Sequence, residues 1–152
     1  MAQDEKKATI MRLSDTELTV ANPAEDIRGR KVVDKDGEDV GEVDDLLVDD
    51  RETKVRFLQV ASGGFLGLGE TKFLIPVDAI TRISDDAVYV NQTRQHIAGA
   101  PRYDPDLINK DVGAGAYPGE SYYHDIYGYY GYPPYWGPGY VYPPYPHYRP
   151  VV

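Results

Sequence analysis

Residues 31–48 read KVVDKDGEDVGEVDDLLV, the pattern of two short strands joined by a tight turn. Lys31–Val33 is rich in β-branched side chains, and Asp36-Gly37 supplies the positive φ angle that a tight hairpin needs. The return strand is predicted over Val40–Val48. Its apolar alternation shifts by one residue at Asp44-Asp45, which indicates a β-bulge. This stretch therefore predicts a β-hairpin.

Four more short strands are predicted after this hairpin, over residues 54–60, 70–77, 79–83 and 87–90. Residues 54–60 alternate as a strand with one face inward, and Pro76 places its strand end at an edge or a break of the sheet. No helix of crossover length separates the strands, which favours antiparallel connection in a small barrel or sandwich. Barrel closure would remove exposed edges. Short helical turns are expected at 22–29 and 93–99.

Composition divides the chain into three parts. Residues 1–22 form a polar N-terminal arm, either loosely ordered or adding one edge strand, and residues 23–108 form the β domain. Residues 109–152 are rich in Tyr, Pro and Gly, and twelve of the fourteen tyrosines lie after Gly115. Because proline at this density opposes helices and ladders, we expect the tail to be disordered.

Charge and cysteine content exclude several classes of function. The formal net charge of the 152 residues is −9. A surface this acidic repels phosphate backbones and anionic lipid, so nucleic acid and membranes are disfavoured partners. There is no cysteine, which excludes disulfides and thiolate sites. No apolar run reaches the length of a membrane span or a secretory signal, and we expect a cytoplasmic protein.

A glycine-rich run, GGFLGLGE at 63–70, precedes FLIP at 73–76 and resembles the signature segment of PRC-barrel domains. That family is shared by the photosynthetic reaction-centre H subunit and a ribosome maturation factor. Further matches occur in the same order, at residues 26–29, 32–33, 36–37, 41–44, 47–49 and 100–104. The resemblance covers about residues 26–104 and implies a six-stranded β-barrel used as a docking and assembly module. It implies no catalytic residues and no cofactor, and neither named role transfers, because the chain lacks a transmembrane helix and an additional N-terminal domain.

The same glycine-rich run is the first candidate contact site. A phosphate-binding loop is disfavoured, because such loops lead into a helix and this one leads into a predicted strand. Phe65, Leu66 and Leu68 are large apolar side chains that either cap the barrel or stand exposed. If exposed, they form an apolar contact surface, and one hypothesis is that this loop docks a second copy of the chain.

Metal and catalytic signals are weak. Asp34, Asp36 and Glu38 resemble the start of a calcium loop, but Gly37 is misplaced for an EF-hand and a hairpin turn explains the pattern better. The carboxylates at 44–45 and 49–50 are interpreted as a solvated face. The three histidines are far apart, and no nucleophile elbow is present. We therefore predict no catalytic, metal or cofactor site, and no enzyme.

The tail supplies the second set of contact candidates. Tyr-Pro-Pro-Tyr occurs at 132–135 and again at 142–145, which makes Tyr132, Tyr135, Trp136, Tyr142 and Tyr145 candidate protein contacts. Phenol rings stack, bond through the hydroxyl and lose little side-chain entropy. A flexible tether, nucleic-acid stacking and recognition of the proline-rich segment by a partner's aromatic groove are the alternatives.

These features together predict a non-enzymatic scaffold. Its barrel associates with itself or docks a protein, and its tail adds many weak contacts. The alternative is a ribosome- or RNA-associated assembly factor, whose binding would weaken steeply with salt.

Overall fold

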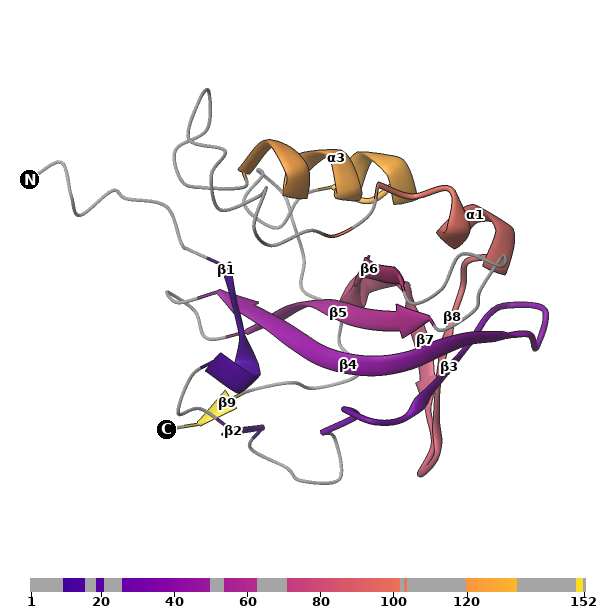
Figure 1. Cartoon of the computed structure of the whole chain (residues 1–152), viewed down its shortest axis with the longest axis horizontal. Helices are drawn as coiled ribbons and strands as arrows, with labels where there is room; N and C mark the ends of the chain where they lie inside the picture. Colours follow the sequence, from indigo (N-terminus) through magenta and orange to yellow (C-terminus); the bar gives the residue numbers. More distant parts are fainter. Residues whose placement is uncertain are drawn as a thin grey trace, which may run out of the picture.

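The computed structural model describes residues 10–15, 19–20, 26–49, 54–62, 71–101, 103, 120–133 and 150–151, and these residues form mainly β-strands. In chain order the elements are β1 (Ile10–Arg12), the 3-10 helix η2 (Leu13–Asp15), β2 (Thr19–Val20), β3 (Lys31–Val33), β4 (Asp39–Asp49), β5 (Val55–Ser62), β6 (Thr71–Pro76), η5 (Val77–Ala79), β7 (Ile80–Ile83), β8 (Ala87–Val90), α1 (Arg94–Ala98), α3 (Glu120–Tyr130) and β9 (Pro150–Val151). Figure 1 shows a strongly twisted sheet with α3 lying over β5 and β6, and α1 next to the end of α3.

Seven strands form the main sheet. Its order is β6-β5-β4-β3-β8-β7, and β1 pairs with β4 beside that path. β3 and β8 run parallel, whereas the other neighbours are antiparallel. The short strands β2 and β9 pair with each other, so the N-terminal arm contacts the far end of the chain.

The local predictions for the β domain are largely confirmed. β3 to β8 lie where six strands were expected, and Gly37 turns the first hairpin with a φ of 85°. The register shifts between Val43 and Asp45, as the bulge requires. α1 begins after Thr93, whose Oγ1 accepts a hydrogen bond from the His96 amide at 3.0 Å. Turn chemistry and alternation therefore fixed the strand positions correctly.

Three features of the predicted architecture were wrong or are not confirmed. The sheet has seven strands instead of six, and the β3–β8 pair is parallel. The hydrogen-bonded path ends at β6 and β7, so the described residues do not close a barrel. Pro76 ends β6 without an amide hydrogen and η5 redirects the chain, which explains the break between these strands.

The seventh strand comes from the N-terminal arm, where the second of the two predicted alternatives is confirmed for residues 10–12. β4 is eleven residues long, but β3 pairs only with its first part. β1 pairs with Leu47–Asp49 on the remaining edge, and Leu13 of η2 is buried behind it. The part of the β4 edge that β3 does not reach is thus paired with residues 10–12 of the arm.

The core is built from aliphatic side chains of the sheet together with Phe57 and Phe73, and α3 adds tyrosines. Its members include Ile27, Val32, Val43, Leu46, Leu58, Val60, Phe73, Ile75, Val88, Ile97, Ile126 and Tyr127. β5 does not match the prediction of one inward face, because every residue from Val55 to Val60 is buried. On the face that carries Phe57, Tyr123 and Tyr127 of α3 cover this ring.

The predicted disorder of residues 109–152 is wrong for residues 120–133. α3 occupies Glu120–Tyr130 and ends at Gly131, whose φ is 84°. The amide of Tyr132 donates to the Tyr127 carbonyl at 2.9 Å, and that of Gly131 donates to the Gly128 carbonyl at 3.2 Å. This glycine-based cap satisfies carbonyls that the helix end leaves free. Residues 150–151 are also paired, and the rest of the predicted tail lies outside the described residues.

Candidate interaction site

One face of α3 carries the contact with the sheet. Tyr123, Ile126, Tyr127 and Tyr130 are buried and follow helical spacing, so they form one stripe. His124, Asp125 and Gly128 lie on the exposed side. We call the contact between this stripe and the sheet the aromatic seam.

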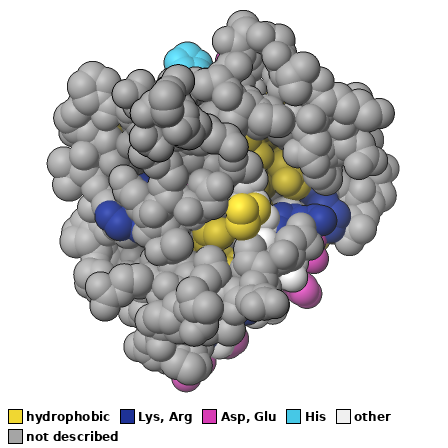
Figure 2. All heavy atoms as spheres, turned by 90° about the vertical axis from the view of Figure 1, so that its left-hand side faces the viewer, with side chains coloured by type: hydrophobic (Ala, Val, Ile, Leu, Met, Phe, Trp, Pro, Cys, Tyr) yellow, Lys and Arg dark blue, Asp and Glu magenta, His cyan; other side chains and the backbone are white. Residues whose placement is uncertain are grey.

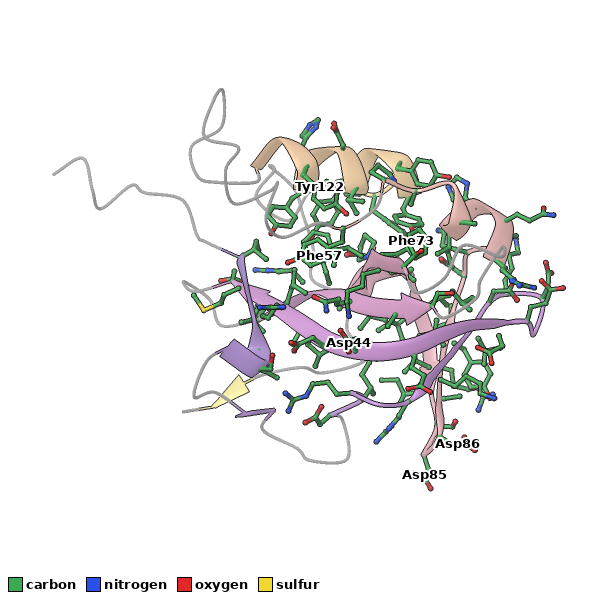
Figure 3. The ribbon with its side chains drawn as sticks, viewed as in Figure 1. Asp44, Phe57, Phe73, Asp85, Asp86 and Tyr122 are labelled. Atoms are coloured by element: carbon green, nitrogen blue, oxygen red, sulfur yellow. The ribbon has the colours of Figure 1, made fainter. Side chains whose placement is uncertain are left out.

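Phe57 of β5 is the centre of the aromatic seam on the sheet side. Its ring centroid lies 5.4 Å from that of Tyr123, with the rings nearly stacked, and 5.2 Å from that of Tyr127. Figure 3 shows Phe57 between β5 and α3. Phe57 pairs with Leu47 and Pro76 in the sheet, so its backbone is held from both sides. A rigid strand thus presents an aromatic ring to the helix.

α1 receives the C-terminal end of α3. The imidazole of His96 stacks on Tyr129 with centroids 4.3 Å apart and an interplanar angle of 13°. The Tyr129 hydroxyl donates to the His96 carbonyl at 2.6 Å, and His96 Nε2 donates to the Tyr129 carbonyl at 3.2 Å. Gly99 leaves the space for this contact, because a Cβ there would lie 2.7 Å from the Tyr129 hydroxyl.

Hydroxyl groups anchor both ends of the aromatic seam. The hydroxyl of Tyr122 donates to the Pro101 carbonyl at 3.1 Å, and its ring lies 6.1 Å from Tyr103. The Tyr132 hydroxyl donates to Asn91 Oδ1 at 2.7 Å. Phenols pack an apolar body while bonding through one polar tip, which suits the rim of a contact.

Burial affects the pKa of two phenols of α3, Tyr122 and Tyr130. Desolvation is the main cause that raises the pKa of Tyr122 and of Tyr130 above the ordinary value for tyrosine. Ionisation of these groups therefore cannot release α3 near neutral pH.

Asp44 and Asp45 lie in the β4 bulge and hold neighbouring elements. Asp44 Oδ2 accepts from Lys72 Nζ and from Gln59 Nε2, each at 2.6 Å. The hydrogen bond from Lys72 is the main cause that lowers the Asp44 pKa. Asp45 is buried, and its carboxylate accepts from the amide and the hydroxyl of Ser14.

The predicted solvated face at 44–45 and 49–50 is therefore wrong for Asp45 and Asp49. Asp49 is fully buried, and its Oδ2 lies 2.7 Å from Nε of Arg56, a side chain that is only 2% exposed. These carboxylates face partners inside the fold because β1 and η2 cover this part of β4. Asp50 lies outside the described residues.

Asp34 confirms the hairpin-turn interpretation of the acidic series at 34–38. Its Oδ1 accepts from the amides of Asp36 and Glu38, both at 2.8 Å, and its Oδ2 accepts from the amide of Arg94 at 2.7 Å. Burial opposes ionisation of this carboxyl, but the hydrogen bonds outweigh it and the pKa of Asp34 is lowered. One carboxylate thus joins the first hairpin to the start of α1.

Most of the contact residues predicted from sequence lie outside the described residues. These are Phe65, Leu66, Leu68, Tyr135, Trp136, Tyr142 and Tyr145. Tyr132 is described, and it contacts the body of its own chain. Ser62 and Thr71, the residues on either side of the glycine-rich run, pair across β5 and β6.

Sequence reasoning missed the residues that make the aromatic seam. Phe57 and His96 carry no motif, and the tail tyrosines were interpreted from composition and repeats without regard to helical spacing. A signal was present, because Tyr123, Ile126, Tyr127 and Tyr130 have helical spacing and Gly131 stands where a helix-ending glycine belongs.

Other kinds of site find no support in the described part of the chain. It contains no group of three or more His, Asp or Glu side chains placed to hold a metal ion. In the same part of the chain, no helix has the length and apolar character that crossing a membrane requires. Figure 2 shows the end of the molecule that carries β1, where described apolar side chains lie beside both basic and acidic ones.

Comparison with known proteins gives one finding on identity. The family described as PRC-barrel domain matches residues 21–97. None of the curated proteins compared with the chain matches it. The matched segment contains all of β3 to β8 and most of α1. The chain therefore belongs to the PRC-barrel domain family.

Proposed function

We propose that this protein is a non-enzymatic docking and assembly module of the cytoplasm, which binds another copy of itself or a partner protein. Membership of the PRC-barrel family supports a role in protein interaction or assembly. The observation that carries the proposal is the seating of α3 on Phe57. A sheet face that holds an aromatic helix is suited to bind an aromatic segment of another chain.

The tail extends this role. The tyrosines of α3 form ring stacks and hydroxyl bonds with the body. Tyr135, Trp136, Tyr142 and Tyr145 repeat the same chemistry farther along the chain, and Phe65, Leu66 and Leu68 add large apolar side chains between β5 and β6 in the sequence. Several weak contacts on one chain reinforce each other through effective concentration.

Affinity purification of the tagged full-length chain at low and high salt, with and without ribonuclease, tests this function. An untagged or differently tagged second copy is co-expressed. We expect a protein, either the second copy or a partner, to co-purify and to survive both about 1 M salt and ribonuclease, because aromatic contacts depend weakly on ionic strength.

The competing outcome identifies an RNA-associated factor. Its co-purifying material would disappear after ribonuclease and weaken steeply with salt through counterion release. The net charge of −9 opposes that outcome.

A further inference from the structure

α3 is attached to the body as a separate contact unit. It touches the sheet through one stripe, and its two ends are fixed by Tyr122 and Tyr132. The preceding described residue, Tyr103, is tied to β6 by its amide, which donates to the Lys72 carbonyl at 3.0 Å. The aromatic seam is thus a complete interface between two parts of one chain.

The helix depends on this interface for its own structure. It has eleven residues, of which five are tyrosine and one is Gly128. Isolated helices of this length are marginal in water, and tyrosine and glycine are weaker helix formers than alanine or leucine. α3 is therefore expected to form only when it packs against the β5 face of the sheet. The same face of a second copy offers the same contacts.

Chain length allows α3 to reach a second copy. Sixteen residues, 104–119, connect Tyr103 to α3. An extended segment of this length spans about 50 Å, which exceeds the diameter of about 30 to 35 Å that a domain of about 100 residues has from its radius of gyration. The same connection permits the intramolecular arrangement, since the rings of Tyr103 and Tyr122 are only 6.1 Å apart.

A second contact would travel with α3. β9 follows it in the chain and pairs with β2 of the N-terminal arm. Any exchange of the segment after residue 119 would carry both α3 and β9 to the same neighbour. Two attachments on one segment raise the effective concentration of each.

We propose that two copies of this chain exchange α3 together with β9, so that each helix lies on the β5 face of the other copy. This inference rests on the proposed docking function and names its partner. A second copy is favoured because the exchanged dimer reproduces every contact already made within one chain, which makes exchange a low-cost route to a dimer. Salt strengthens the dimer, because each copy carries a net charge of −9 and screening reduces their repulsion.

Complementation between two full-length variants tests the exchange. The helix-side variant, Tyr123→Ala with Tyr127→Ala, removes the rings that contact Phe57. The receptor-side variant, His96→Ala with Gly99→Gln, removes the ring that stacks on Tyr129 and fills the space beside its hydroxyl. His96 and Gly99 are exposed and Gly99 has an ordinary φ of −87°, so the sheet should fold in this variant.

Sedimentation across protein concentration is the measurement, with tags of different mass on the two variants. We expect the wild-type chain to dimerise at high concentration and each variant alone to remain monomeric. An equimolar mixture should form a one-to-one heterodimer at a concentration about tenfold or more below that of the wild-type dimer. The intact helix belongs to the receptor-side variant and the intact face to the helix-side variant. Neither therefore has a competing partner within its own chain, which favours binding between the two chains.

Two results would overturn the exchange. A wild-type chain that stays monomeric at millimolar concentration refutes it, although capture of a partner protein would still support the docking function. Variants that each dimerise as well as wild type place self-association on another surface, so the function stands and the exchange fails. Amide exchange at α3 checks that both variants have lost their own aromatic seam, and Phe57→Ala replaces the receptor-side variant if α3 stays protected in it.

Discussion

The sheet and α3 are buried to a similar degree but by different side chains. Leu58 of β5 and Ile126 of α3 are both fully buried, and Tyr127 is only 1% exposed. The sheet achieves this mainly with Val, Leu and Ile held between paired strands, whereas α3 uses a stripe on a single face in which three of the four residues are tyrosines. Spacing of large side chains, more than composition, therefore decides whether a segment packs.

The two regions also differ in what supports them. Strands of the sheet are paired with neighbours and share one core, so disrupting one strand is expected to unfold the whole β domain. α3 is held through one face and through the hydrogen bond from His96 Nε2 to the Tyr129 carbonyl. Segments with few external contacts open locally before the whole domain unfolds. We expect two levels of stability, and three predictions test this difference, starting with the largest effect.

Asp49→Ala should destabilise the whole β domain. The variant leaves Arg56 charged and buried but removes the carboxylate that pairs with its Nε, which costs about 3–5 kcal/mol. Urea unfolding followed by circular dichroism measures this loss. The control is Lys72→Ala, which removes the half-exposed pair with Asp44 and should cost less than about 1 kcal/mol. Equal losses in the two variants would contradict the distinction between buried and exposed pairs.

Tyr127→Ala should release α3 and leave the sheet folded. The variant loses the contact with Phe57 and about 3 kcal/mol of local stability, the lower end for removing a buried aromatic ring. Amide exchange should show lost protection at residues 120–131 and unchanged protection in β4 and β5. Asp125→Ala on the exposed side of α3 is the matched control. If protection in β5 falls together with that in α3, the two regions form one cooperative unit instead.

Asp34→Asn should produce a smaller, pH-dependent effect on the link between the first hairpin and α1. At pH 7 we expect a loss of about 1–2 kcal/mol, because Asn keeps only one of the two acceptor oxygens. Bonds to the remaining oxygen lose their charge assistance, and an NH2 group replaces the other oxygen, which accepts a backbone amide in the wild type. The folded-state pKa of Asp34 is lowered. Its stabilisation is therefore complete above the unfolded-state pKa near 4 and is lost as pH falls through the folded-state value.

Unfolding measured between pH 7 and pH 2 checks this sign. Wild type should lose stability below about pH 4 more steeply than Asp34→Asn. Part of the slope should remain in the variant, because the pKa values of Asp26 and Asp44 are also lowered. Parallel pH profiles for the two proteins would show that Asp34 contributes no charge-dependent stability.

The sequence alone determined the features that depend on neighbours in the chain. The turn at Asp36-Gly37, the bulge at Asp44-Asp45, the break at Pro76 and the helical turn over 93–99 are local, because each follows from the φ angles and hydrogen-bonding groups of a few consecutive residues. The family signature fixed the β class for the same part of the chain.

Tertiary structure decided which distant segments meet. Parallel pairing of β3 with β8, the addition of β1 to β4 and the burial of both faces of β5 depend on surfaces that only the folded sheet offers. The tyrosines of α3 became helical for the same reason. Their spacing permits an amphipathic helix, but a helix of this length gains its stability from the face that receives it, and Phe57 and His96 are placed there by strands and turns far away in the sequence.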